Sequence, residues 1–313
     1  MRPFRFLADV SAIADAAHLA AAAHRAEAAG YHVLVLGDHL LEQLAPIPAM
    51  AAIAAVTERV RIGTFVLNND LRHPAVLAQD LATLDLLSGG RLDIGIGAGW
   101  NESEYAAIGL AFDPPGIRVA RMAEGISVLK GCFADGPFSF RGTYYTVTGL
   151  DGQPKPVQRP HPPFLVGGGG RRVLEIAARE AAIVGLAPRA VSVANRVVTD
   201  SLAPAVADRI AWVREVAGAR FDELDLNVYP AVGRLTVTAH ARREATELAA
   251  RLANRYGEEV TPDELLESPF VLIGSVAGLA EKLVSLRERF GINSVTVFDA
   301  DAFAPVVERL AGT

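Results

Sequence analysis

The most informative part of the sequence runs from Arg72 to Glu102 and reads RHPAVLAQDLATLDLLSGGRLDIGIGAGWNE. Its apolar spacing predicts a helix over 75–87, a Gly-Gly turn and a short buried strand over 92–97. A loop containing Trp100, Asn101 and Glu102 follows that strand. Loops after the carboxyl ends of strands carry the chemistry of α/β barrels. We therefore expect this loop to contribute to an active site.

The same alternation of strand and helix runs through the rest of the chain. Eight near-continuously apolar runs are typical of parallel strands that helices cover on both faces. They are Phe4–Ala8, Val33–Gly37, Arg61–Leu67, Leu92–Gly97, Phe164–Gly168, Ala182–Leu186, Leu226–Val232 and Val295–Phe298. Helical patterns lie between them, for example Val119–Cys132, Val173–Glu180, Ala205–Ala217 and Val276–Phe290. Eight alternations predict an α/β fold of the closed (β/α)8 TIM barrel type, with a doubly wound open sheet as the alternative.

Two segments interrupt this alternation, so we predict a single barrel domain over 1–313 with two insertions. Residues 136–163 follow the fourth strand and begin with a hairpin-like pair, Phe138–Phe140 and Tyr144–Val147. Residues from about 241 to 270 lie between strands seven and eight and add helices over 241–256 and 262–268. Such insertions either build the substrate pocket or its lid, or are length-tolerant surface loops.

Composition excludes several classes of protein. The formal net charge is −6 and no basic run is present, which argues against a nucleic-acid partner. No apolar segment approaches the roughly 20 residues of a membrane span. Asp9 and Asp15 interrupt the region where a signal peptide would be apolar, so we expect a cytoplasmic protein. Cys132 is the only cysteine, which excludes an intrachain disulfide and a cysteine-based metal cluster.

Polar side chains follow most of the predicted strands. They are Asp9, Asp38–His39, Asn68–Asn69, Trp100–Glu102, Gly167–Arg172, Arg234 and Asp299. On a barrel they would converge on one rim. His39 suits acid/base catalysis there, although a lone histidine can equally be structural. The seven histidines show no metal-ligand spacing, so we predict no metal site.

The run FLVGGGGRRV at 164–173 is the clearest anion site. Its glycines allow a ligand close to the backbone, and the N-terminus of the following helix attracts negative charge. Arg171 and Arg172 could add bidentate contacts to a cofactor phosphate. The structural alternative is a flexible turn with two solvated arginines. Neither this run nor 95–99 reads G-x-G-x-x-G, which argues against a nicotinamide dehydrogenase of the Rossmann type.

Other catalytic classes have less support. No G-x-S-x-G elbow is present, and Cys132 falls at the end of a predicted helix. Asp38 and Glu102 could be proposed as a glycosidase pair, but their separation is not readable from sequence.

Four segments together resemble the luciferase-like monooxygenase superfamily, most closely its branch that uses the deazaflavin coenzyme F420. They are Gly37–His39, Arg61–Leu67, Arg72–Glu102 and Phe164–Leu186. The resemblance implies a barrel that is usually a homodimer, with the cofactor ring over the carboxyl ends of the strands. It also implies a cis peptide bond between Phe65 and Val66, behind the ring.

The resemblance further implies roles for individual residues. His39, Asn101 and Glu102 would be catalytic. The cofactor would be bound by Asp38, Thr64, Phe65, Val66, Trp100, Asn101, Gly167, Gly168, Gly169, Gly170, Arg171, Arg172 and Val173. Two positions depart from the family pattern. Glu175 stands where the sugar-phosphate dehydrogenases have a lysine, which argues against glucose 6-phosphate, and Phe65 replaces a commonly small residue.

We therefore predict an oxidoreductase that transfers a hydride between coenzyme F420 and an unidentified small organic substrate. The first alternative is a two-component FMN monooxygenase, which uses O2 and receives reduced flavin from a separate reductase. The second is a non-catalytic flavin-binding accessory protein, against which the presence of His39 and Glu102 argues.

Overall fold

The structure is a computed structural model that describes residues 2–12, 15–189 and 198–313. Its main sheet contains β1 (Arg5–Asp9), β2 (Val33–Leu36), β3 (Arg61–Thr64), β4 (Leu67–Asn68), β5 (Leu92–Gly97), β8 (Phe164–Gly168), β9 (Ile183–Leu186), β10 (Asp225–Val228) and β13 (Ile292–Val297). The strand order is β3-β2-β1-β13-β10-β9-β8-β5-β4, and β3 also pairs with β5. Because β3, at one end of this order, also pairs with β5 near the other end, the sheet closes into a barrel. This confirms the (β/α)8 barrel, and the open-sheet alternative is wrong.

The helices lie between these strands in the chain. They are α1 (Ala16–Ala28), α2 (Pro46–Val56), α3 (Pro74–Leu87), α4 (Glu102–Ala107), α5 (Pro115–Phe133), α6 (Arg171–Glu180), α7 (Ala203–Ala217), α8 (Ala241–Tyr256), α9 (Pro262–Glu267), α10 (Val276–Phe290) and α11 (Ala300–Leu310). Three short 3-10 helices complete the set: η1 (Asn69–Leu71), η2 (Val198–Ser201) and η3 (Gly218–Glu223). None of these described helices has both the length and the apolar character needed to cross a membrane.

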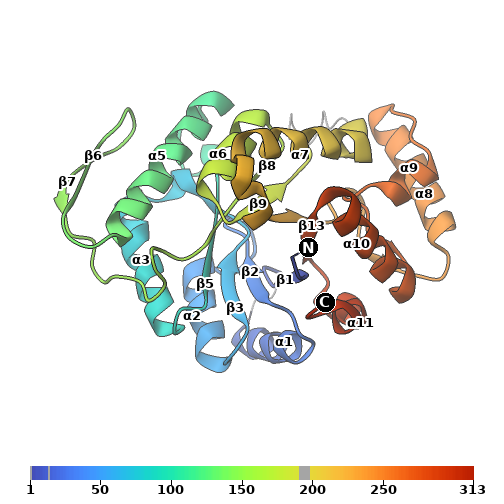
Figure 1. Ribbon diagram of the computed structural model, residues 1–313, viewed down its shortest axis with the longest axis horizontal. Helices are drawn as coiled ribbons and strands as arrows, with labels where there is room; N and C mark the ends of the chain where they lie inside the picture. Colours follow the sequence, from blue (N-terminus) through green and yellow to red (C-terminus); the bar gives the residue numbers. More distant parts are fainter. Residues whose placement is uncertain (1, 13–14, 190–197) are drawn as a thin grey trace. The chain divides into compact units, whose positions relative to one another are not determined.

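The chain divides into two compact units. Unit 1 contains Met1–Asp9, Arg25–His32 and Gly167–Thr313, and unit 2 contains Val10–His24 and Val33–Val166. In unit 2, α2, α3 and α5 cover β2, β3 and β5 (Figure 1). Each of these helices begins with a proline in its first turn, where the missing N–H costs no hydrogen bond. Ile53, Leu81 and Ile126 from the three helices are fully buried against the sheet.

The insertion after β5 contains the predicted hairpin. Its strands β6 (Phe138–Arg141) and β7 (Thr146–Leu150) pair in antiparallel fashion. The Glu124 carboxylate on α5 accepts hydrogen bonds from the backbone N–H groups of Thr143 and Tyr144, both at 2.8 Å. This contact ties the turn of the hairpin to α5, while the rest of the hairpin extends beyond α3 and α5 (Figure 1).

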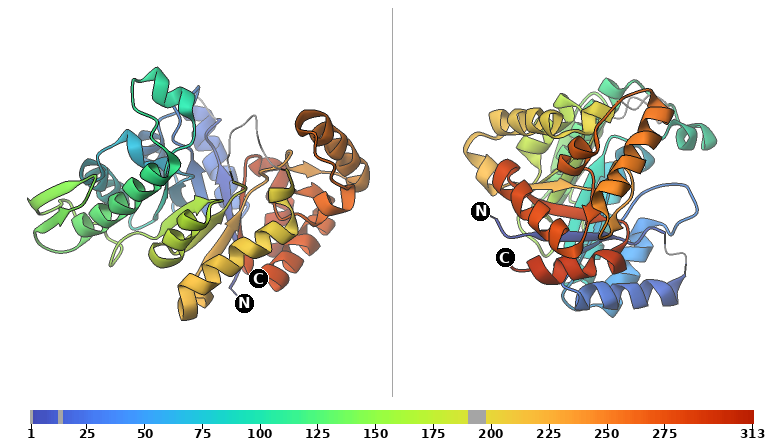
Figure 2. Two further views of the ribbon diagram at one scale, coloured as in Figure 1. Left: turned by 90° about the horizontal axis from the view of Figure 1, so that it is seen from above. Right: turned by 90° about the vertical axis from the view of Figure 1, so that its right-hand side faces the viewer.

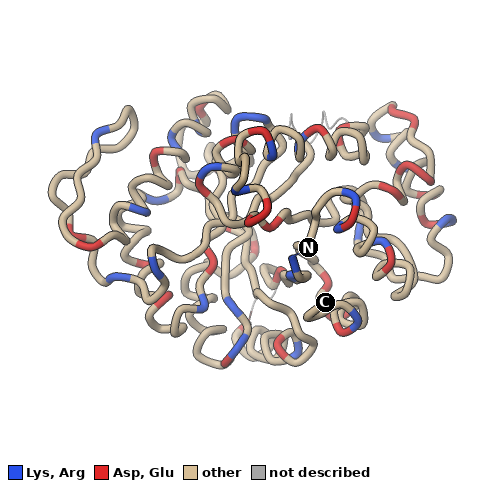
Figure 3. Tube along the Cα trace, in the orientation of Figure 1, with Lys and Arg blue, Asp and Glu red and all other residues tan. Residues whose placement is uncertain are grey.

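In unit 1, the helices expected in the second insertion are observed as α8 and α9, which lie side by side (Figure 2). A capping box begins α9, in which Thr261 and Glu264 satisfy each other's backbone N–H groups. Sequence reasoning missed a two-residue parallel pair, β11 (Thr236–Val237) with β12 (Ile273–Gly274), that flanks the two helices in the chain. Figure 3 shows that Lys and Arg are interspersed with Asp and Glu along the described chain.

One contact in unit 1 predicts a pH dependence of stability. The Nδ1 atom of His32 accepts a hydrogen bond from the backbone N–H of Phe6 at 3.2 Å, which requires an unprotonated nitrogen. Burial, assisted by the charge of Arg5, lowers the pKa of His32. The unfolded chain then binds more protons than the folded one as the pH falls through about 6.5, so acid destabilises the fold.

We expect the free energy of unfolding, measured with urea, to fall between pH 7.5 and pH 5.5. The fall should be smaller in His32→Asn, whose amide oxygen can accept the same bond without titrating. An equal fall in both proteins would contradict this assignment.

Candidate active site

The carboxyl end of β3 lies tightly against β5. The Phe65–Val66 peptide bond is cis, which confirms the prediction and divides the expected third strand into β3 and β4. The Thr64 hydroxyl donates to the Gly95 carbonyl at 2.7 Å and accepts the Gly95 N–H at 2.9 Å. A Cβ atom on Gly95 would lie 1.9 Å from the Thr64 carbonyl oxygen, and one on Gly97 would lie 2.8 Å from Val66 Cγ2. These two glycines therefore let β5 approach the cis peptide.

His39 follows β2 and is held by a buried carboxylate. Its Nδ1 atom lies 3.1 and 3.0 Å from the two carboxylate oxygens of Glu104, whose side chain is 5% exposed. The backbone N–H of Leu40 also donates to Glu104, at 3.1 Å. Because a carboxylate only accepts hydrogen bonds, the contact places a proton on Nδ1 of His39. The Nε2 atom is then left to accept or donate a proton elsewhere.

The loop after β5 places an aromatic side chain beside this histidine. Trp100 is 54% exposed, and its ring meets the His39 ring edge-to-face with centroids 5.6 Å apart. Asn101 precedes α4, and its amide oxygen accepts a hydrogen bond from Ser103 at 2.7 Å. Glu102 is exposed. The structure thus brings Trp100 and the Glu104 carboxylate to His39.

A buried network fixes the helix that carries Glu104. The Tyr105 hydroxyl is buried and lies 3.0 Å from both Asn68 Oδ1 and Asp70 Oδ2, two acceptors that share its single proton. Burial raises the pKa of Tyr105 to about 12, so it stays protonated as a donor. Asp70 in turn makes two hydrogen bonds of 2.7 Å with Arg121 on α5. Because Tyr105 directly follows Glu104 in α4, its contacts with Asn68 and Asp70 also restrain Glu104.

Asp38 has a partner that sequence reasoning did not identify. The guanidinium of Arg72 donates to its two carboxylate oxygens at 2.6 and 3.1 Å, and the backbone N–H of Asn68 donates at 3.0 Å. Asp38 is 4% exposed. Its buried charge is therefore compensated by Arg72, and its contacts join the end of β2 to β4.

In unit 1, the glycine turn leads directly into α6. Gly170 is the N-cap, no side chain caps this helix end, and a Cβ atom on Gly170 would meet nothing within 4 Å. A Cβ atom on Gly169 would lie 2.5 Å from the backbone nitrogen of Arg189. The turn is thus packed on one side at Gly169 and open at Gly170. Arg171 pairs with Glu175 and Glu215, both at 3.0 Å, so two carboxylates already engage the guanidinium predicted to bind an anion.

A buried arginine braces the same turn from α7. Arg209 is 1% exposed, and its Nε atom donates to the Gly169 carbonyl at 3.3 Å. Its remaining nitrogens donate to the Asp200 carbonyl at 2.8 Å and form an ion pair with the Asp200 carboxylate. Asp200 also accepts the backbone N–H of Arg189 at 2.6 Å. Sequence reasoning missed Arg209, because a lone arginine in an amphipathic helix gives no signal of burial.

The described residues contain no group of three or more His, Cys, Asp and Glu side chains arranged to hold a metal ion. Comparison with known proteins adds the decisive observation. The sequence profile of the luciferase-like monooxygenases matches residues 1–294. This chain belongs to the luciferase-like monooxygenase family. The family comprises oxidoreductases and monooxygenases, and the resemblance drawn from the sequence is confirmed at this level.

Similar sequences in the family differ in their cofactors. The F420-dependent glucose-6-phosphate dehydrogenase of Nakamurella multipartita is 33% identical over 211 residues, 64% of this chain and 58% of that protein. The FMNH(2)-dependent dimethylsulfone monooxygenase of Pseudomonas putida is 36% identical over 128 residues, 41% of this chain and 35% of that protein. In each case the match spans less than two thirds of the relative.

A solved structure supports the fold. The coenzyme F420-dependent tetrahydromethanopterin reductase of Methanopyrus kandleri superposes with a TM-score of 0.77 at 19% identity, covering 99% of this chain and 98% of that one. At this identity the similarity shows that the luciferase-like fold is shared.

Proposed function

We propose that this luciferase-like protein is an F420-dependent oxidoreductase that transfers a hydride between the coenzyme and a small organic substrate. The observation that carries the proposal is the His39–Glu104 pair beside Trp100. Hydride transfer to a carbonyl carbon leaves charge on the carbonyl oxygen, which a proton donor must neutralise, and the reverse reaction needs a base at the same place. A histidine with Nδ1 held by a buried carboxylate has its Nε2 atom available for either task.

The residues after the strands of unit 2 would hold the flat ring of the coenzyme. The bound deazaflavin would supply the carbon that donates or accepts the hydride. We propose that the exposed Trp100 indole packs against the ring, and that Phe65 and Val66 support it from the cis peptide. His39 exchanges a proton with the substrate oxygen through Nε2. Glu104 keeps the proton on Nδ1, while Asn101 and Glu102 offer hydrogen-bonding groups at the start of α4.

The turn before α6 is the proposed phosphate-binding segment, formed by Gly167–Val173. Its fit rests on the uncapped N-terminus of a ten-residue helix, whose dipole favours an anion, and on the open approach at Gly170. Backbone N–H groups carry the proposed contact. Arg171 adds positive charge nearby, although Glu175 and Glu215 already pair with it.

The preference for F420 over FMN is supported by the extent of sequence similarity. The match to the F420-dependent relative extends over 211 residues and the match to the FMNH(2)-dependent one over 128. The higher identity of the shorter match, 36% against 33%, favours a flavin monooxygenase as the second candidate. That function would require O2 and a reductase partner.

Two assays separate these functions. In the first, purified protein, F420 and a panel of alcohols and aldehydes are mixed without oxygen, and the visible absorbance of the oxidised deazaflavin is followed. In the second, reduced FMN is supplied by a flavin reductase and O2 consumption is measured with the same panel. We expect substrate-dependent change in the first assay only. Substrate-dependent O2 consumption without F420 turnover would replace our proposal with the monooxygenase.

A further inference from the structure

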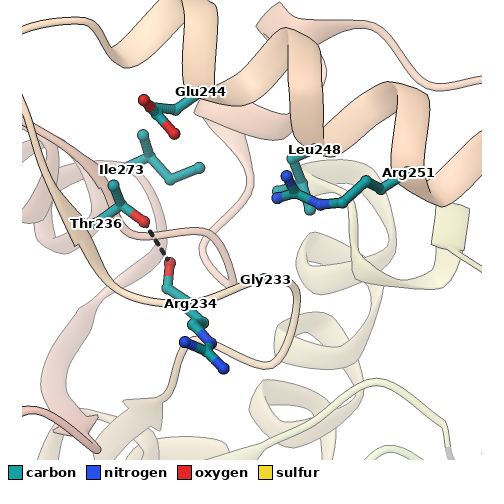
Figure 4. Close-up of a pocket in the computed structure, with 7 residues that line it drawn as sticks. All are labelled: Gly233, Arg234, Thr236, Glu244, Leu248, Arg251 and Ile273. Carbon is teal, nitrogen blue, oxygen red and sulfur yellow. Dashed lines mark hydrogen bonds between the residues drawn. The ribbon is translucent and has the colours of Figure 1, made fainter.

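A pocket in unit 1 is lined by residues that the proposed hydride-transfer site does not use. Its volume is about 520 Å3, within the range of small-molecule sites. It is built where the loop after β10, the β11–β12 pair and α8 meet, and its side chains are those of Arg234, Thr236, Glu244, Leu248, Arg251 and Ile273 (Figure 4). Helix α8 of the second insertion therefore forms one wall of this open pocket.

Two arginines in this pocket lack a carboxylate partner. Within residues 2–12, 15–189 and 198–313, neither Arg234 nor Arg251 forms an ion pair, and both are exposed. Two other arginines of α8 are paired, Arg242 with Asp263 at 2.6 Å and Arg243 with Glu244 at 3.0 Å. The pair with Arg243 partly offsets the charge of Glu244 from outside the pocket. An excess of positive charge therefore remains in the lining.

The rest of the lining is largely apolar. Leu248 is 3% exposed and Ile273 is 7% exposed, and both face the cavity. The Thr236 hydroxyl donates to the Arg234 carbonyl at 3.3 Å, which links β11 to the loop that carries Arg234 (Figure 4). Guanidinium groups bind carboxylates strongly because their N–H groups match the two oxygens. An apolar wall beside them favours a ligand with a hydrocarbon part.

We infer that this pocket binds an organic carboxylate, with Arg234 and Arg251 on the anion and Leu248 and Ile273 on the apolar part. The carboxylate has two possible sources, the substrate or the acidic tail of the coenzyme. The assignment of the carboxylate to one of these two sources rests on the proposed function, whereas carboxylate binding itself does not.

Isothermal titration with octanoate and octanol tests the inference without any turnover. The wild-type protein should bind octanoate at least about tenfold more tightly than octanol, because only octanoate engages the arginines. The double variant Arg234→Gln/Arg251→Gln should bind the two probes alike. Arg255→Gln removes an arginine of α8 that does not line the pocket, and should bind octanoate as the wild type does. Thermal unfolding verifies that each variant is folded.

Equal binding of octanoate and octanol by the wild type, or unchanged octanoate binding by the double variant, would overturn the inference. Titration with F420 and with its tail-less chromophore identifies the source. A double variant that binds F420 more weakly but the tail-less chromophore normally assigns the pocket to the coenzyme tail. Normal binding of both, together with lost octanoate binding, assigns it to the substrate. Failure of F420 to bind the wild type would remove the proposed function and leave the octanoate result standing.

Discussion

His39→Ala should lower the rate of substrate-dependent F420 turnover by about a hundredfold to ten-thousandfold, the usual contribution of a positioned general acid or base. The alanine cannot exchange a proton with the substrate oxygen. Because the imidazole is 27% exposed, its removal should leave the fold intact. The measurement is kcat on the first substrate that the anaerobic panel identifies, together with the Kd for F420, which should change far less than kcat.

Two further variants refine this result. Glu104→Gln removes the charge that holds the Nδ1 proton but keeps an acceptor, so we expect a smaller loss, roughly tenfold to a hundredfold in kcat. His18→Ala is the matched control, because His18 is 81% exposed and pairs with Asp15 on the surface. Unchanged turnover in His39→Ala would remove His39 from the mechanism.

Arg209→Met should cost about 3–5 kcal/mol of unfolding free energy, the usual effect of removing one member of a buried ion pair. Asp200 is 6% exposed, and the change would remove one of the positive charges that compensate its carboxylate. The Gly169 carbonyl would also lose the hydrogen bond from Arg209. Urea unfolding measures the cost. Because Arg209 contacts the glycine turn, we also expect weaker binding of F420 under conditions where the variant is folded.

Arg214→Met on the same helix is the matched control for Arg209. Arg214 is exposed and lies over the Phe221 ring at 4.2 Å, so its loss should change stability by at most about 0.5 kcal/mol. Asp200→Asn in the Arg209→Met background should recover part of the loss, since it removes the uncompensated charge. A cost under about 1 kcal/mol for Arg209→Met would contradict the bracing role.

The order of strands and helices was predictable because most apolar runs end at glycines or polar turns. Residues 92–97 and 164–168 are strands with the expected bounds. The seventh strand ends at Val228 rather than Val232, because Pro230 has no N–H to donate to a neighbouring strand. The eighth begins at Ile292 rather than Val295. Asn293 and Ser294 are polar, so the apolar pattern did not extend the predicted strand to them. Both are nevertheless buried and hydrogen-bonded to β10.

The candidate site was only partly predictable. Its position after the strands follows from the barrel, which is why His39 and Trp100 were identified. The hydrogen-bond partners of the site residues were not predictable, because they depend on the directions of side chains in three dimensions. Glu102 and Glu104 both fall in the first turn of α4, and six residues are too few for a helical period to show which of them is buried. Arg209 meets Gly169 forty residues away along the chain, a contact that no local pattern indicates.

Equilibrium titration of the purified protein with F420 and, separately, with FMN tests the deazaflavin assignment. We expect micromolar or tighter binding of F420 and FMN binding at least about tenfold weaker, a difference of roughly 1.4 kcal/mol. A preference for FMN would contradict the deazaflavin assignment and favour oxygen activation with a reductase partner. Binding of neither cofactor would contradict the proposed cofactor chemistry at His39 altogether.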